Sequence, residues 1–159
     1  MANGRMLTKG LLMNNRYLTV SNDSKALFQY LVVFADDDGI VERSMMFDAP
    51  LNVGDSNYKE LEDQGLIISY DNQIKVVTDW NALQTIRKDI YQTSEHVEVK
   101  HTLYLKTDFS YSTNKDDDHV MISLDNWIVA DRPKDRDKIK QFQKAVNVSP
   151  SKSPFDNDF

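Results

Sequence analysis

The stretch Ala35-Asp36-Asp37-Asp38-Gly39-Ile40-Val41 decides the fold expected of this chain. The apolar residues before it recur at three- and four-residue spacing, at Leu27, Tyr30, Leu31 and Phe34. This spacing predicts a helix with one buried face, which begins at Ser21 or Asn22 as its N-cap. Gly39 can adopt the left-handed backbone that ends a helix, and Ile40-Val41 is typical of a short strand.

Two more helices and a hairpin are expected downstream. One helix covers residues 44–48 and ends before Pro50, and the next is capped by Asp55 or Ser56 and runs to about Gln64. The β-branched runs 66–70 and 73–77 flank the polar pair Asp71-Asn72 and predict a β-hairpin. The apolar side chains that return to the core after it are Trp80, Leu83 and Ile86.

This order of elements predicts an α+β fold of the winged-helix type, a helix-turn-helix with a β-hairpin wing. We expect the winged-helix domain to cover residues 1–92. A partly structured extension of uncertain structure follows over residues 93–148, and a disordered acidic tail over 149–159.

Within the extension, short apolar segments alternate with polar ones. Residues 97–99 and 102–105 are expected to be strands or one continuing extended segment, and 110–118 a polar loop. Residues 120–130 are apolar enough to pack against another element, and 138–146 can form a short helix.

The composition restricts the class of protein. The 159 residues include no cysteine, which excludes disulfides and thiolate metal sites. The chain has no run of about 18 apolar residues that could span a membrane and no signal peptide, so a cytoplasmic protein is expected. The net charge is −6, and residues 1–92 carry nine basic against thirteen acidic side chains.

No catalytic or cofactor motif is present. The sequence lacks a Walker loop, a Rossmann glycine fingerprint and a nucleophile elbow. The triplets Asp36-Asp37-Asp38 and Asp116-Asp117-Asp118 lack the oxygen ligands of a calcium loop, and His96 and His101 lack zinc partners. We therefore expect no enzyme, no cofactor and no metal.

Four sequence features resemble the phage replisome organisers of low-GC Gram-positive bacteria, relatives of the DnaD-type primosome initiators. These features lie between Met6 and Tyr91: the junction 35–41, Leu66-Ile67-Ile68, Trp80, and Ile86-Arg87-Lys88-Asp89. The resemblance implies a non-catalytic winged-helix replication factor that binds origin double-stranded DNA and recruits helicase-loading proteins.

Two departures from that family reduce the positive charge. The family's Pro-Lys-Lys helix is replaced by residues 43–48, and its closing Lys-Asp-Arg-Tyr-Lys by residues 88–92. The helix expected to read the major groove exposes one lysine against four carboxylates. The remaining nucleic-acid-binding candidates are Asn57, Lys59, the wing residue Lys75, Arg87 and Lys88. The alternative is that these are ordinary surface charges paired with Asp79 and Asp89.

The basic cluster lies near the C-terminus, where residues 131–144 hold six basic and three acidic side chains. The expected partner-binding residues are Arg132, Lys134, Arg136, Lys138 and Phe159. The basic group would bind nucleic acid or an acidic partner. Phe159 ends a tail that resembles those of single-strand-binding proteins. For the basic group, the alternative is a solvated face, because three aspartates are interspersed in it. For the tail, the alternative is a chance similarity over six residues.

A second function is left open. A winged helix can be repurposed to bind proteins and to inhibit a host nucleic-acid enzyme, as anti-CRISPR and anti-restriction proteins do. The acidic domain and the apolar Met45-Met46-Phe47 favour this alternative. The partners expected are therefore DNA and replication or other host nucleic-acid proteins, and a homodimer is also left open.

Overall fold

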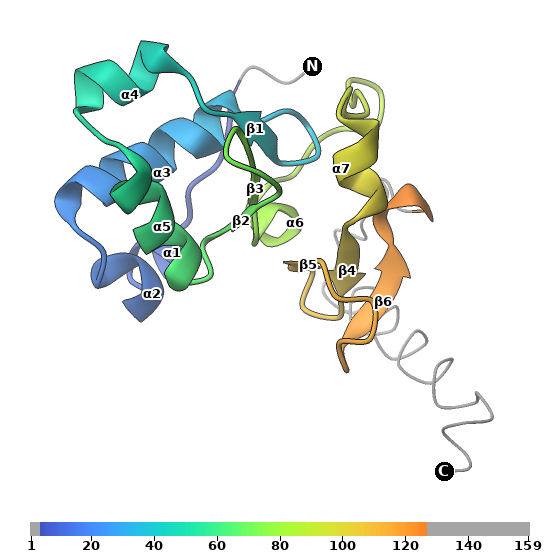
Figure 1. The fold of residues 1–159 in the computed structure, drawn as a ribbon. Coiled ribbons are helices and arrows are strands. Elements are labelled where there is room, and N and C mark those ends of the chain that lie inside the picture. Colours follow the sequence, from blue (N-terminus) through green and yellow to red (C-terminus); the bar gives the residue numbers. More distant parts are fainter. Residues whose placement is uncertain (1–3, 127–159) are drawn as a thin grey trace.

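A computed structural model describes residues 4–126 (Figure 1). It is a mixed α+β structure with seven α-helices and two small antiparallel three-stranded sheets in this range. The α-helices are α1 (Lys9–Leu12), α2 (Asn15–Leu18), α3 (Asn22–Phe34), α4 (Met45–Leu51), α5 (Asp55–Asp63), α6 (Trp80–Leu83) and α7 (Val97–His101). None of these helices has the length and apolar character needed to cross a membrane.

The first sheet contains β1 (Ile40–Glu42), β2 (Ile67–Ser69) and β3 (Ile74–Val77) in the order β1-β3-β2. The expected hairpin is confirmed as β2 and β3, with Ile68 opposite Val76. The expected strand after the acidic junction is β1, which pairs with β3. Helices α1–α5 lie on one side of this sheet in Figure 1, and α3 packs on α4 and α5.

The second sheet contains β4 (Tyr104–Lys106), β5 (Tyr111–Ser112) and β6 (Val120–Ser123) in the order β5-β4-β6. Helix α7 precedes it, and the 3₁₀ helix η1 (Leu124–Asn126) follows it and packs on α7. The prediction of a strand at 97–99 is wrong because this segment is α7, which buries Val99 and leaves Val97 exposed. The prediction of a loop at 110–118 is wrong at Tyr111–Ser112, because a buried Tyr111 anchors β5 there.

Capping residues mark the start of α3, the end of α4 and the start of α5. Ser21 is the N-cap of α3, as expected, and its side chain accepts the Ser24 N–H. Helix α4 continues through Pro50, so the expected end before this proline is wrong. Proline in the last turn removes only one backbone donor, and Asn52 (φ 54°) ends the helix instead. The N-cap of α5 is Gly54 rather than Asp55 or Ser56.

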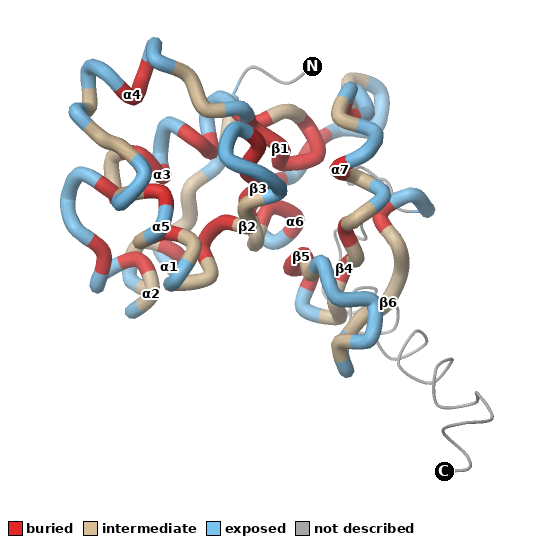
Figure 2. The backbone as a smooth tube through the Cα atoms, viewed as in Figure 1, coloured by how far each residue is buried: buried red, intermediate tan, exposed pale blue. Residues whose placement is uncertain are grey.

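The buried apolar side chains form one cluster that reaches both sheets. Figure 2 marks buried residues in both parts of the chain. Trp80 is fully buried within it, and Leu83 and Ile86 are buried as expected. Leu105 of β4 and Leu124 of η1 belong to the same cluster. Residues after 92 therefore share a core with the preceding sheet. The helix expected at 138–146 and the tail at 149–159 lie outside the described residues.

Candidate functional site

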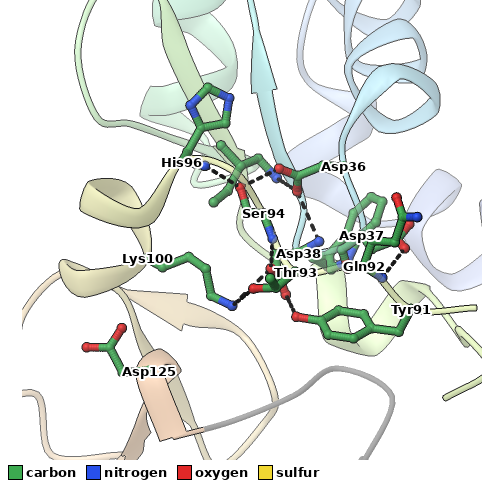
Figure 3. Close-up of polar contacts among 12 residues, drawn as sticks. Asp36, Asp37, Asp38, Tyr91, Gln92, Thr93, Ser94, His96, Lys100 and Asp125 are labelled. Carbon is green, nitrogen blue, oxygen red and sulfur yellow. Dashed lines mark hydrogen bonds and ion pairs between the residues drawn. The ribbon is translucent and has the colours of Figure 1, made fainter. Parts of the chain in front are cut away.

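The acidic junction between α3 and β1 is held by hydrogen bonds from distant parts of the chain (Figure 3). Asp36 Oδ1 accepts the backbone N–H groups of Asp38 and Ile40, both at 3.0 Å. Its Oδ2 accepts the Ser94 hydroxyl at 2.6 Å. Burial raises the pKa of Asp36, although these hydrogen bonds oppose the increase.

Asp37 is fully buried and binds two further segments. Its Oδ1 accepts a hydrogen bond from Arg5 Nη2 at 2.9 Å, and its Oδ2 accepts the Gln92 N–H at 3.0 Å. Its backbone carbonyl accepts the Trp80 indole N–H at 2.9 Å. A buried carboxylate is tolerated here because a guanidinium and an amide both donate to it.

Asp38 is also fully buried and connects to the segment leading into the second sheet. Its carboxylate accepts the Tyr91 hydroxyl at 2.7 Å and the Ser94 N–H at 2.8 Å, and Lys100 Nζ lies 3.1 Å away. The Asp38 carbonyl accepts the Tyr111 hydroxyl at 2.6 Å. Burial, followed by the hydrogen bond to Asp38, raises the pKa of Tyr91 well above its usual range.

The acidic junction is therefore a structural connection between α3, β1 and the segment 91–100. Each of the three carboxylates has donors from this chain, and both fully buried ones face a cation. Within residues 4–126, no three His, Asp or Glu side chains are grouped in a way that could hold a metal ion. The sequence suggested a turn at this position, which the structure confirms, but it did not reveal the partners Arg5, Ser94 and Lys100.

The α5 candidates for nucleic-acid binding are engaged within the protein. Asn57 Oδ1 accepts the Gly54 N–H, and its Nδ2 donates to Ser24 Oγ, each at 3.1 Å. Lys59 is exposed and forms an ion pair with Asp63 one turn along the helix. The amide of Asn57 thus joins the start of α5 to α3 and does not face outward as a free group.

The wing candidate Lys75 is buried, with an exposed fraction of 4%. Its Nζ donates to Ser69 Oγ and to the Asp71 carbonyl, each at 2.9 Å, and lies 5.5 Å from the Tyr58 ring centroid. Burial lowers the pKa of Lys75. This ammonium is used inside the fold and is not presented to solvent.

The candidates after α6 are exposed. Arg87 Nη2 lies 2.6 Å from Asp89 Oδ2, in the pairing expected from the sequence, and Lys88 is exposed beside it. Asp79 pairs with Arg16, which is not one of the candidate residues. Its Oδ2 lies 2.7 Å from Arg16 Nη2. Among the described residues, Arg87 pairs with the nearby Asp89 rather than with a side chain of α5. The partner-binding candidates Arg132, Lys134, Arg136, Lys138 and Phe159 lie outside the described residues.

An exposed apolar patch covers the end of α3 and the start of α4, and the sequence only partly indicated it. Phe34, Met45 and Met46 are 59%, 74% and 85% exposed, whereas Phe47 is buried beneath them. We call the exposed residues the α3–α4 patch: Tyr30, Val33, Phe34, Met45 and Met46. The Phe34 and Phe47 rings stack at 5.6 Å between centroids, so the patch is continuous with the core.

A groove of 520 Å³ adjoins this patch. One wall comes from α3, β1 and α4 and includes Phe34, Phe47 and Met46. The facing wall is residues 92–96, the segment that the acidic junction holds in place. The hydrogen bonds that hold residues 92–96 on the acidic junction therefore also position one wall of the groove.

The chain matches no family model, no curated protein and no solved structure.

Proposed function

We propose that the protein is a non-catalytic winged-helix factor that acts by binding other macromolecules. Support for the winged helix comes from the order α3-β1-α4-α5-β2-β3 and the sheet order β1-β3-β2. In this assignment α5 is the third helix and the β2–β3 hairpin is the wing. The same layout is implied by the resemblance to phage replisome organisers.

The folded body is proposed to contact proteins rather than the DNA backbone. The observation that carries this step is the exposed α3–α4 patch, because contiguous apolar side chains on a surface mark interaction sites. Methionine and aromatic side chains adapt well to protein partners. The function supported best is therefore recruitment of replication proteins, as a phage- or mobile-element-type replication factor.

Charge supports the same choice. Residues 4–126 contain twelve basic and twenty acidic side chains, a net charge of −8. DNA affinity arises largely from neutralising phosphates, and Lys75 and Asn57 are already used inside the fold. Duplex contact is assigned to the basic residues 131–144 of the sequence.

Salt-titrated duplex binding of the full chain, measured by fluorescence anisotropy, tests this assignment. We expect weak binding that is lost by about 0.2 M salt, because few phosphates are contacted. A purified helicase-loading protein of a Gram-positive host should instead form a complex that persists at that salt. Sequence-preferring DNA binding that survives about 0.2 M salt, with no protein complex, would overturn the proposal.

The net charge of −8 over residues 4–126 favours a second candidate, an inhibitor of a host nucleic-acid enzyme. An acidic body can occupy the basic channel in which such an enzyme holds its substrate. Inhibition of a purified host nuclease, competitive with DNA and without any helicase-loader complex, would select this function over recruitment.

A further inference from the structure

We propose that the groove beside α4 receives a basic, apolar peptide segment of a partner protein. This inference rests on the proposed protein-binding function and specifies the chemistry of the partner. It is carried by the shape of the groove, its apolar wall and the sign of its charged lining.

The apolar wall offers room for side chains from another molecule. Phe34, Phe47 and Met46 line it together with Ile40 and Val41 of β1. The largely exposed Met46 side chain can fold over an inserted group. A volume of 520 Å³ lies within the range of ligand-binding pockets, and the apolar anchors of a docked helix would fill it.

The charged lining is acidic. Asp36, Asp37, Glu42 and Glu95 line the groove, together with His96, and no lysine or arginine does so among the described residues. Arg5 already neutralises Asp37, whereas Glu42 and Glu95 are exposed and form no ion pair within the described part of the chain. The rim of the groove therefore carries two carboxylates that can pair with cationic side chains of a partner.

This charge selects between classes of occupant. A second copy of the chain would bring another acidic groove and a net charge of −6, and nucleic acid would bring phosphates. Both would be repelled by Glu42 and Glu95. A peptide with lysine or arginine beside apolar anchors complements the rim and the wall at once.

The test uses the full chain and a fluorescein-labelled peptide of about 18 residues, built from leucine and lysine with helical amphipathic spacing. Two control peptides are a scrambled sequence of the same composition and a version with glutamate in place of lysine. We expect only the amphipathic lysine peptide to bind, with an affinity that falls as salt rises.

Paired variants assign the binding to the groove. Combining Phe34→Ser with Met46→Ser should weaken the peptide about tenfold or more, as expected for central apolar anchors. The control Met13→Ser removes an apolar side chain that is 71% exposed outside the patch and should leave the affinity unchanged. Combining Glu42→Gln with Glu95→Gln should weaken binding and flatten its salt dependence, whereas Glu98→Gln on exposed α7 should do neither. Equal affinities across all variants, or no binding, would overturn the proposal.

A photo-cross-linking residue at Met45 identifies the occupant in the full chain. Cross-links to the added peptide support the proposal. A peptide-resistant cross-link to residues 131–144, or to a second copy, would overturn it by showing that the chain fills its own groove. If the wild-type chain does not bind the peptide but still forms the helicase-loader complex, only the groove proposal is rejected. If the wild-type chain forms neither complex, the proposed recruitment is rejected as well.

Discussion

Lys100 Nζ lies 3.1 Å from Oδ2 of Asp38, so α7 is paired with the junction between α3 and β1. The Asp38 side chain is fully buried and that of Lys100 is 12% exposed. Tyr91 and Ser94 donate to the same carboxylate, which therefore holds the segment that leads from the first sheet to the second. This pair is therefore predicted to hold the two sheets together.

Substituting Asp38→Asn should destabilise the protein by about 3 kcal/mol, because it removes one partner of a nearly buried ion pair. The Asn side chain keeps the size but leaves the Lys100 ammonium without its counter-charge. Urea unfolding at neutral pH measures the change. The control Asp118→Asn alters an exposed carboxylate and should have little effect. Equal stability of the two variants would show that the pair is dispensable.

Asp36→Asn, by contrast, should change the stability little. The Asn Oδ1 can still accept the Asp38 and Ile40 N–H groups, and its Nδ2 can donate to Ser94 Oγ. The buried charge disappears, so the free energy of unfolding at neutral pH should change by less than about 1 kcal/mol. Comparison with Asp38→Asn by urea unfolding separates the roles of two adjacent aspartates.

The pH dependence provides an independent test of Asp36. Its pKa is raised by burial above the ordinary value of 3.8, so the folded state binds the proton more readily than the unfolded chain. As the pH falls through this raised pKa toward 3.8, Asp36 should increasingly stabilise the wild type. Asp36→Asn lacks this gain. As the pH falls, the free energy of unfolding of the wild type should therefore rise relative to that of the variant. Parallel stability profiles from pH 7 to about pH 4 would contradict the assignment.

Gly39→Ala should destabilise the junction through two effects. Gly39 has φ +88°, and a Cβ atom there would lie 2.5 Å from Cγ of the buried Trp80. The left-handed backbone and the overpacking together should cost about 2–4 kcal/mol in urea unfolding. Gly10→Ala is the matched control, because its Cβ would meet only Thr8 Oγ1 at 3.9 Å. An unchanged midpoint in Gly39→Ala would mean that the Trp80 packing can relax at no cost.

The sequence predicted α3, β1 and the β2–β3 hairpin because their patterns are local. The spacing of Leu27 and Leu31 marks one helix face, and the β-branched runs on either side of Asp71-Asn72 mark a hairpin. In the second sheet, the segment expected to be extended at 102–105 overlaps β4, whereas β5 escaped prediction because it has only two residues within a polar segment. Its anchor, the Tyr111 hydroxyl, binds a carbonyl of the acidic junction far away in the sequence.

The candidate site was harder to predict than the fold. Side chains alternate between the two faces of a strand, so Lys75 would be expected on the face away from Ile74 and Val76, in contact with solvent. All four residues of β3 are buried, because Ser69 and Tyr58 receive the lysine side chain. Likewise, three consecutive aspartates predict a turn, but their burial depends on Arg5 and Lys100, which no local pattern connects to them.

The two lysines first considered for DNA binding should therefore separate experimentally. Lys75→Gln removes donors to Ser69 and the Asp71 carbonyl and should cost about 1–2 kcal/mol in urea unfolding. Lys59→Gln alters an exposed ion pair and should leave the unfolding midpoint unchanged.

Neither substitution should change the salt dependence of duplex binding, since the lysine of the wing is enclosed and that of α5 pairs with Asp63 on a helix that carries three further carboxylates. Lys138→Gln, in the basic stretch, should instead lower the slope of log affinity against log salt by about one unit. Anisotropy titrations at several salt concentrations measure this slope. A reduced slope in Lys59→Gln, with Lys138→Gln unchanged, would return the duplex contact to α5 and overturn the assignment of the folded body to protein partners.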